Sequence, residues 1–360
     1  MTVPADLIVE NGLSPSRSVA ADSYLLRRLG DPESGGKPTL RIYTLERPSL
    51  LLGRYQPVPA DVSPETLRPG DAHGIGRRLT GGRAVPAGPG FVGISLALPR
   101  AWDLAGDPDR ILPPELVLNR YVRGVLRGCH PLGVKAVYMG RDILTVDRKR
   151  IAVVGFTFSP EGAVLFECHL ALSGSLAELE GGLADAPPGK PFASFLISPP
   201  VTSLRAESGR EISIEDLAEA IRRGSEHRLG LASQERPWTG KEQEGIDRIR
   251  QERTDTAAWV EDRKPRPAEV HRAESEIQLG RFSAALARGE DGRIASVTLA
   301  GDFLSDDRTL AELEGALSGQ LCDWTVLGTR TDQVLNRPGR FILGLGSRRV
   351  IPDTVLQAAG

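Results

Sequence analysis

The sequence contains few cysteines, and their number is odd. Three cysteines in 360 residues cannot build a framework of paired disulfides. A few free thiols are typical of proteins that stay in a reducing compartment. The cysteine content therefore argues against a disulfide scaffold, and we expect a cytoplasmic location.

The chain also lacks a long hydrophobic run. The longest, FVGISLAL at residues 91–98, is far shorter than the roughly 20 apolar residues that cross a bilayer. The opening residues MTVPADLIVENG show neither the basic nor the apolar region of a signal peptide. We therefore expect no membrane partner.

Neither sign of charge is in excess. The chain has 45 basic and 47 acidic residues and a net charge of −2, so nothing in its charge points to nucleic acid or to an anionic membrane as a partner. Hydrophobic residues make up 40% of the chain, which is enough for a globular core, and the length allows two domains.

Two common nucleotide-binding motifs are missing. The glycine spacing fits neither a dinucleotide fingerprint nor a P-loop, and no cysteine and histidine set has the spacing of zinc ligands. The chain has instead GRRLTGGRAV at residues 76–85. A glycine pair lets backbone N–H groups converge on an anion, and the arginines add fixed charge and paired donors. An arginine-rich surface loop is the alternative interpretation.

Apolar spacing predicts both helices and strands. We expect helices at residues 17–30 and 113–128 and one beginning at a Ser213 cap, and strands within 38–56, 90–100, 141–147, 150–158 and 163–172. Tight turns between the last three strands indicate an antiparallel sheet. Prolines near Lys264–Ala268 predict a boundary, followed by a hairpin about residues 289–292 and a helix at 309–320.

The order of several motifs resembles one family over nearly the whole chain. VAADSYLL (19–26), LRIYTL (40–45), SLLLGRYQ (49–56), RRLTGGRAV (77–85) and RDILTVDRKRIAVVGF (141–156) follow in the order of the lipoate–protein ligases, within the biotin/lipoate ligase superfamily. In that family the glycine motif reads Arg-Arg-x-Ser/Thr-Gly-Gly-Gly-Ala-Val. The later segment EIQLG…GDFLS (276–305) is similar to the family's small accessory domain.

The resemblance implies an α+β fold. A mixed, mostly antiparallel sheet flanked by helices would form a catalytic domain in residues 1–265, and a small α+β domain would follow in 269–360. It also implies a two-step ligase: lipoate attacks ATP to give lipoyl-AMP, and a lysine of a carrier domain then takes the acyl group. The implied carrier is of the dehydrogenase E2 or glycine-cleavage H protein type, and the implied cofactors are ATP and Mg²⁺.

The matching positions supply the expected site. The resemblance places Arg78, Gly81 and Gly82 in the nucleotide and acyl-adenylate loop. Asp142 matches a family aspartate near the nucleotide and its metal, and carboxylate oxygen is a ligand that Mg²⁺ prefers. Arg83 lies in the same loop, where the family has its third glycine. Glu167 lies on a later strand at the place of a family histidine.

The chain departs from the family where the chemistry is expected. The family's His-Asp stretch and later Asn are replaced by Ala87, Gly88 and Phe91. The family's essential lysine precedes Ile-Ala/Ser-Gly, and that position is Arg150 here. Lys149 is one residue earlier, on the opposite face of a regular strand, so it replaces the family lysine only if the strand slips or bulges. Both remain catalytic candidates, and two basic residues on an exposed hairpin turn are the alternative.

The strand AVLFECHLAL (163–172) has two distinct faces. Alternation places Cys168 with apolar residues on one face, which predicts a core cysteine. It places Glu167 and His169 on the other face, either as a polar pair in a pocket or as a solvated surface. The segment FLISPPVTSL (195–204) contains no cysteine, which counts against a cysteine-dependent acyl transferase. Cys129, His130 and Cys322 are expected to be structural.

Three hypotheses follow. The chain is a working ligase for lipoate or a related acid, a catalytically inactive member of the fold that binds acyl groups, nucleotide or lipoyl domains, or a ligase for a different carboxylate.

Overall fold

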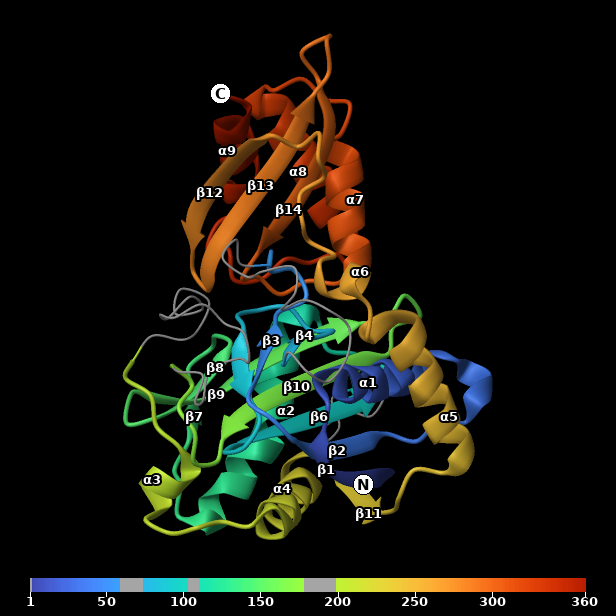
Figure 1. The fold of residues 1–360 in the computed structure, drawn as a ribbon, viewed down its shortest axis with the longest axis vertical. Coiled ribbons are helices and arrows are strands. Elements are labelled where there is room, and N and C mark those ends of the chain that lie inside the picture. Colours follow the sequence, from blue (N-terminus) through green and yellow to red (C-terminus); the bar gives the residue numbers. More distant parts are fainter. Residues whose placement is uncertain (1, 59–73, 103–109, 178–198) are drawn as a thin grey trace.

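The computed structural model describes residues 2–58, 74–102, 110–177 and 199–360, and is built around one large sheet (Figure 1). In these residues eight strands pair in the order β11-β1-β2-β6-β10-β9-β8-β7. β1 is parallel to β2 and β11, and the remaining pairs are antiparallel. The strands are β1 Val3–Leu13, β2 Thr39–Leu45, β6 Phe91–Leu98, β7 Val137–Tyr138, β8 Ile143–Val146, β9 Lys149–Phe158, β10 Val164–Ala171 and β11 Leu231–Glu235.

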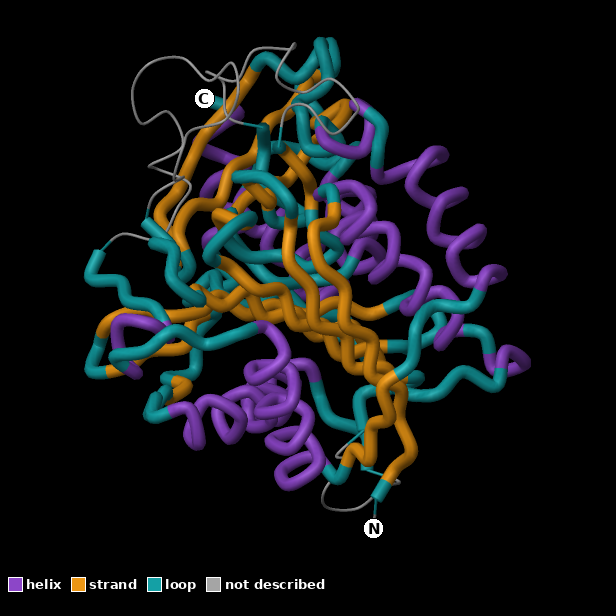
Figure 2. Tube along the Cα trace, turned by 60° about the horizontal axis from the view of Figure 1, so that its bottom comes forward, coloured by secondary structure: helices purple, strands orange, loops and turns teal. Residues whose placement is uncertain are grey.

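Helices cover both faces of this sheet (Figure 2). One face packs on α2 (Pro114–Cys129) and α4 (Ile214–Leu229), and the other on α1 (Pro15–Gly30) and α5 (Gly240–Ile249). A small sheet, in the order β4-β3-β5, also lies over the second face. The strands of this small sheet are β3 Ser49–Leu52, β4 Ile75–Arg77 and β5 Val85–Ala87. Short helices elsewhere in this part of the chain are α3 Leu204–Ser208 and α6 Ala257–Val260, with two 3₁₀ turns at Pro32–Ser34 and His130–Leu132 and a π-helical turn at Arg250–Thr254.

Local sequence fixes the ends of these helices. The Ser14 side chain accepts a hydrogen bond from the Arg17 N–H and caps α1, which begins at a proline. The expected Ser213 cap accepts from the Asp216 N–H, and Gly230, at φ 69°, ends α4 in the left-handed conformation. Both helices can then turn an apolar stripe towards the sheet.

Residues beyond 270 form a separate antiparallel sheet with its own helices. The strands β12 His271–Ile277, β13 Gly280–Arg288 and β14 Ile294–Gly301 pair in that order, and the helices are α7 Asp307–Leu317, α8 Trp324–Leu335 and α9 Val350–Ala359. Phe282, Leu299, Leu313 and Val355 belong to a hydrophobic cluster of this unit. The cluster also contains Tyr55, which comes from the first half. The division into domains at residues 265–269 stays a prediction.

The expected α+β class, with its mostly antiparallel sheet, is confirmed. The sequence-based prediction missed β1, β11, α8 and α9. β1 and β11 pair in parallel with strands distant in sequence, so no hairpin signal marks them. In the described part of the chain, no helix combines the length and apolarity needed to cross a membrane.

Candidate functional site

The glycine turn at residues 80–82 lies directly on the large sheet. A Cβ added at Gly155 of β9 would sit 2.9 Å from the Thr80 Oγ1 and 3.2 Å from the Gly81 carbonyl oxygen. Only a residue without a side chain lets the turn approach this closely. The turn therefore lies in close contact with the middle of β9 and β10.

The two adjacent arginines have different roles. The Arg77 guanidinium donates to the carbonyls of Val260, Gly53, Arg54 and Gln56, so it holds several backbone segments together. Burial lowers its pKa to about 9. Such a fully engaged side chain has no donor to offer a ligand.

Arg78 points the other way, into the site. It is 1% exposed, and its Nη1 lies 3.7 Å from the Glu167 Oε2. Its Nη2 donates to the carbonyl of Arg83 at 2.7 Å and to that of Gly81 at 3.3 Å, so it braces the turn. Burial lowers the pKa of Arg78, although the Glu167 charge opposes this. Arg78 is thus a buried cation beside the turn.

Glu167 and His169 lie together on a buried face of β10, so the structure has the polar pair, one of the two alternatives that the sequence left open. The Glu167 Oε2 accepts a hydrogen bond from the Thr80 hydroxyl. Burial raises the pKa of Glu167 to about 7 against the opposing charge of Arg78, and it lowers the pKa of His169 well below its usual value. The Nε2 of the neutral His169 ring finds no hydrogen-bond partner in the part of the chain that the structure describes. The solvated-face alternative for this pair is therefore wrong.

Asp142 reaches the same place from the start of β8. A Cβ added at Gly82 would be 3.9 Å from both the Asp142 Oδ2 and the Arg78 Nη2. Among the described residues, neither the buried Asp142 Oδ2 nor the buried Arg78 Nε has a hydrogen-bond partner. Burial raises the pKa of Asp142, and the charge of Arg83 is the largest influence that lowers it. A buried cation, a buried carboxylate and a glycine turn therefore surround one polar spot.

A second buried charge network borders this spot, and sequence reasoning missed it. Arg41, which is fully buried, pairs with Glu10 at 2.6 Å and with Asp22 at 3.1 Å. Asp22 also accepts from the Ser95 hydroxyl at 2.9 Å, and its negative charge contributes to the raised pKa of Glu167. Tyr43 lies under the Arg41 guanidinium at 4.1 Å. One signal in the sequence could have revealed this network: Asp22 is a charged residue on the apolar face of α1 that packs against the sheet.

The C-terminal unit covers the turn. The Gly82 N–H donates to the Phe303 carbonyl at 2.9 Å, and a Cβ added at Gly81 would lie 2.2 Å from that oxygen. The Arg83 Nε donates to the Leu279 carbonyl. The Tyr55 and Phe303 rings stack 5.0 Å apart. These contacts, here called the seam, join the glycine turn to residues 279–304.

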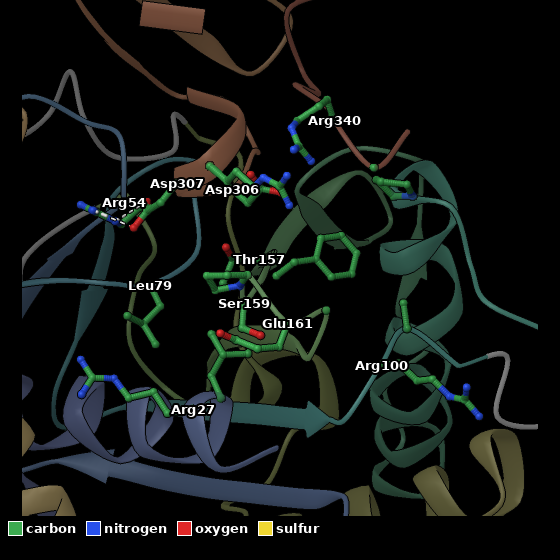
Figure 3. A pocket seen from close by; sticks show the side chains of 18 of the residues that line it. Arg27, Arg54, Leu79, Arg100, Thr157, Ser159, Glu161, Asp306, Asp307 and Arg340 are labelled. Atoms are coloured by element: carbon green, nitrogen blue, oxygen red, sulfur yellow. Dashed lines mark hydrogen bonds and ion pairs between the residues drawn. The ribbon is translucent and has the colours of Figure 1, made fainter. Parts of the chain in front are cut away.

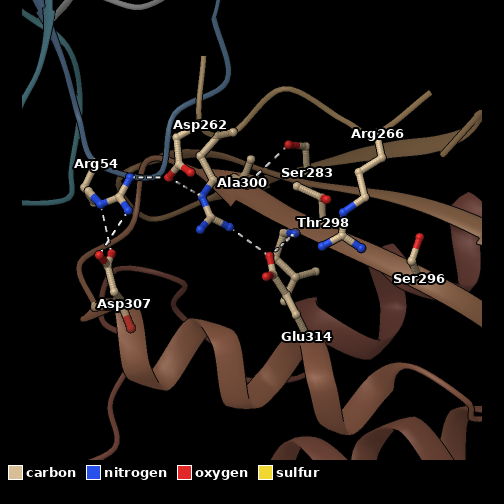
Figure 4. Close-up of polar contacts among 12 residues, drawn as sticks. Arg54, Asp262, Arg266, Ser283, Ser296, Thr298, Ala300, Asp307 and Glu314 are labelled. Atoms are coloured by element: carbon tan, nitrogen blue, oxygen red, sulfur yellow. Dashed lines mark hydrogen bonds and ion pairs between the residues drawn. The ribbon is translucent and has the colours of Figure 1, made fainter. Parts of the chain in front are cut away.

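Ion pairs extend the seam (Figure 4). Arg54 pairs with Asp262 and, through both carboxylate oxygens at 2.9 and 3.0 Å, with Asp307. Arg263 pairs with Glu314 at 2.9 Å. Because Arg54 is almost fully buried, its charge depends on these two carboxylates.

The two catalytic candidates lie at the far end of β9. Arg150 is five residues from Gly155, which corresponds to roughly 15 Å along a strand. The Lys149 ammonium pairs with Glu207, and the Arg150 backbone pairs with Pro200 and Thr202. The structure therefore does not bring these two side chains to the turn.

A bulge in β9 determines the direction of these two side chains. Leu144 of β8 pairs with Ala152, but the next residue, Thr145, pairs with Arg150, so Ile151 is the extra residue. Paired residues share a face, and this register places Arg150 on the face of Val153 and His169. Without the bulge Lys149 would lie there. The hairpin turn itself is Asp147–Arg148, both at positive φ, so Lys149 and Arg150 are strand residues rather than turn residues.

The remaining sequence expectations concern the cysteines and the departures from the family. Cys168 is fully buried in the core on the α2 side, as expected, and Cys129 lies in the same cluster. Ala87 and Phe91 are buried apolar residues near β3 and β6. Residues 195–198 of the segment without cysteine lie outside the described residues.

A cavity of about 820 Å³ opens beside the turn (Figure 3). Its inner wall includes Leu79 and Thr157, and its rim carries Arg27, Arg253 and Arg340. The described residues contain no cluster of three or more histidine, cysteine or acidic side chains able to hold a metal ion. Among the described residues, Asp142 therefore does not belong to such a cluster.

Comparison with known proteins gives the same family as the sequence motifs. Residues 14–225 match the family described as the lipoyl protein ligase A/B catalytic domain. No curated protein matches this sequence. Among solved structures, the bipartite lipoate protein ligase of Thermoplasma acidophilum is 21% identical with a TM-score of 0.55, covering 72% of this chain and 96% of that one. LipL1 of P. falciparum, in complex with lipoate, is 13% identical with a TM-score of 0.68, covering 98% and 99%.

A lipoate-protein ligase A bound with ATP is 20% identical with a TM-score of 0.53, covering 72% of this chain and 99% of that one. At these identities the similarity shows a shared fold. The family match covers more than half of the sequence. The chain therefore belongs to the lipoyl protein ligase A/B catalytic domain family.

Proposed function

We propose that this protein activates lipoate, or a related acid, with ATP and passes the acyl group to a lysine of a carrier domain. One observation carries the proposal: Arg78, Gly82 and Asp142 meet at one buried spot, where the Arg78 Nε and the Asp142 Oδ2 lack hydrogen-bond partners. Buried polar atoms are rarely left unpaired, so unpaired atoms that converge beside a glycine turn favour a polar ligand there.

The residues fit an acyl-adenylate. Arg78 would hold the phosphate and the mixed anhydride with fixed charge, which low exposure strengthens. The Asp142 carboxylate would hold Mg²⁺, which usually binds one or two carboxylates together with phosphate oxygens. When bound, the metal would neutralise charge on the leaving pyrophosphate. Glu167 and Arg83 would complete the walls of this site.

Arg150 is the better catalytic candidate of the two basic residues. The bulge places it on the face of β9 that carries Gly155 and pairs with Glu167 and His169, whereas Lys149 is held by Glu207. An extended acyl-adenylate lying along β9 from the turn would approach Arg150, whose fork can bind two phosphate oxygens. Arg150 then replaces the ammonium of the family lysine with a permanent charge.

The similar structures support the choice of ligands. One of them is a complex with ATP, another is a complex with lipoate, and the Thermoplasma ligase was analysed together with its E2 lipoyl domain. We propose ATP and lipoate, or a related acid, as ligands and a lipoyl-type domain as the acceptor. The location would be cytoplasmic.

An inactive, binding-only protein is the second candidate. Two contacts favour it: the Gly82 N–H is already bonded to Phe303, and Lys149 is already paired with Glu207. Both groups would need to be released before they could serve a nucleotide.

Pyrophosphate release separates the two candidates. ATP and Mg²⁺ are mixed with the protein and with lipoate, octanoate or biotin separately, and release is compared for wild type, Arg78→Met and the surface control Arg228→Gln. We expect release with at least one acid, loss in Arg78→Met and no change in Arg228→Gln. No release with any acid, alongside measurable lipoyl-domain binding, would establish the binding-only role.

A further inference from the structure

The cavity beside the turn has walls from both halves of the chain. The first half contributes α1, Leu79 and the β9–β10 hairpin from Thr157 to Gly162, and the C-terminal unit contributes the start of α7 and residues 338–340 (Figure 3). At about 820 Å³ it is in the range of cavities that enclose a small organic molecule.

The cavity begins at Leu79, the residue next to Arg78 of the proposed adenylate site. Leu79 lies between Arg78 and Thr80 in the chain and lines the cavity, whereas its two neighbours face Glu167. Thr157, also in the lining, is two residues beyond Gly155 on the same face of β9, roughly 7 Å along the strand. An extended chain gains about 3.6 Å per three bonds, so an eight-carbon acid activated at the turn would end inside the cavity.

Apolar side chains line the cavity from both faces of the sheet. Leu26 and Leu79 lie on the α1 side, which is the face of Gly155 and Thr157, and Leu112 and Phe158 lie on the α2 side. They can hold methylene groups away from water, at roughly 0.8 kcal/mol for each buried CH₂. The body of the ligand is therefore expected to be an aliphatic chain.

The rim of the cavity is charged, and part of its positive charge is uncompensated. Arg54 is balanced by Asp262 and Asp307, and Arg340 by a two-pronged pair with Glu312. In the part of the chain that the structure describes, Arg27, Arg100 and Arg253 form no ion pair with a carboxylate.

Two of these cations lie on the α1 side of the cavity. Arg253 lies over the Trp259 ring at 4.2 Å. Burial, followed by the charges of Arg54 and Arg27, lowers its pKa, and the charges of Asp307 and Asp262 act against this. Glu161 of the β9–β10 hairpin is exposed, and its Oε2 would lie 2.9 Å from a Cβ added at Gly30, the last residue of α1. Asp306 caps α7. An anion between Arg27 and Arg253 would relieve this repulsion.

From this arrangement we infer that the acid activated by this protein carries a second acidic group at its far end, making it a medium-chain α,ω-dicarboxylate of about eight carbons. The inference rests on the proposed function and specifies its substrate class. The near carboxylate is activated beside Arg78, the chain lies over Leu79 and Leu26, and the far carboxylate binds Arg253 and Arg27. A dithiolane ring has no charge for these arginines to bind.

The chemistry balances with ATP as the co-reactant. A near carboxylate oxygen forms a bond to the α-phosphorus, the α–β phosphoanhydride bond breaks, and pyrophosphate leaves. A lysine amine of the carrier then bonds to the acyl carbon, the acyl–phosphate bond breaks, and AMP and a proton leave. The far carboxylate takes part in neither step, so the product is an amide with a free terminal acid.

The test compares octanedioate with octanoate, which differ only at the far end. Binding of each acid to the full-length protein is measured by calorimetry without ATP, and pyrophosphate release is measured with ATP. The variants are Arg253→Gln and Arg27→Gln, with Arg228→Gln on α4 as the matched surface control. Arg253→Lys keeps the charge, and thermal melting confirms that each variant is folded.

The expected result is tighter binding and faster activation of octanedioate than of octanoate. Arg253→Gln should weaken octanedioate binding about tenfold or more and octanoate binding less than about twofold, because a hydrogen bond to a charged group is worth roughly 1.5–3 kcal/mol. Arg253→Lys should retain part of the preference, and Arg228→Gln all of it.

The outcomes distinguish this inference from the proposed function. Activation of octanoate or lipoate with no preference for octanedioate would overturn the dicarboxylate assignment and leave the ligase intact. Octanedioate binding that depends on Arg253 without any pyrophosphate release would support the cavity assignment and overturn the ligase. An equal effect of Arg253→Gln on both acids would show a structural role and refute the inference.

Discussion

The close approach of Gly81 to Phe303 in the seam gives a specific structural prediction. A Cβ added at Gly81 would lie 2.2 Å from the Phe303 carbonyl oxygen, whereas ordinary van der Waals contact begins at 3.4 Å. In Gly81→Ala the carbonyl must therefore retreat by about 1.2 Å. The φ of Gly81 is not in the left-handed region, so an alanine meets this steric conflict without backbone strain.

The cost follows from what moves with the carbonyl. Its hydrogen bond from the Gly82 N–H is worth about 1 kcal/mol, and the stacking of Phe303 on Tyr55 about the same. With the usual strain of overpacking, the expected loss is about 2–4 kcal/mol in the free energy of unfolding. The affected contacts are those that join the turn to the C-terminal unit.

Urea denaturation at equilibrium measures this loss, provided that the slope of the transition is unchanged. Gly315→Ala is the control, because this exposed glycine of α7 has no atom within 4 Å of an added Cβ. It should gain roughly 0.5–1 kcal/mol from its higher helix propensity. If the free energy of unfolding of Gly81→Ala lies within about 0.5 kcal/mol of the wild-type value, the reasoning is refuted, because the seam contacts would then adjust to the added methyl group at little cost.

Three further predictions concern the site itself. Arg78→Met should lower acyl-adenylate formation at least about 100-fold, measured as pyrophosphate release, since one lost donor to a developing anion costs that much. Glu167→Gln should flatten the pH dependence of the free energy of unfolding. In the folded wild type the pKa of this carboxyl is raised to about 7, so its contribution to stability is complete below about pH 4.5 and is lost as the pH rises through 7. Urea titrations at several pH values measure the difference. Asp142→Asn should raise the Mg²⁺ concentration for half-maximal activity about tenfold, and an unchanged Mg²⁺ profile would remove Asp142 from the metal site.

Local patterns were enough for the elements that carry the turn. The alternation in β10 correctly separated Cys168, in the core, from Glu167 and His169. The Ser213 cap formed as the sequence indicated. Both features depend on neighbours within a few residues, which a sequence shows directly.

Features that depend on contacts between residues distant in the chain could not be predicted from the sequence. The bulge at Ile151 reverses which of Lys149 and Arg150 shares a face with Val153, and it arises from register with β8. The buried pair of Asp22 and Arg41 joins a helix to a strand 19 residues later. The cover that Phe303 provides over the turn joins residues more than 200 positions apart.

The replacement of the third family glycine by Arg83 does not disrupt the turn. Gly82 has φ 89°, a conformation that requires glycine, but residue 83 is not in the left-handed region, so a side chain is tolerated there. That side chain reaches the Leu279 carbonyl, and its charge acts against burial to lower the pKa of Asp142. Arg83 therefore adds an electrostatic link between the site and the C-terminal unit.

The rebuilt segment after the turn has a simpler explanation. An added Cβ at Gly88 would lie 2.5 Å from the Arg47 carbonyl oxygen, and one at Gly90 would lie 2.9 Å from the Gly174 nitrogen. Phe91 packs against the same Gly174. PAGPGF is thus a close-packed structural bend, and it offers no polar group in place of the family's His-Asp stretch. Under the proposed function, Arg83 and the cavity beside Leu79 are therefore the features of the described residues that we expect to change which acid is accepted.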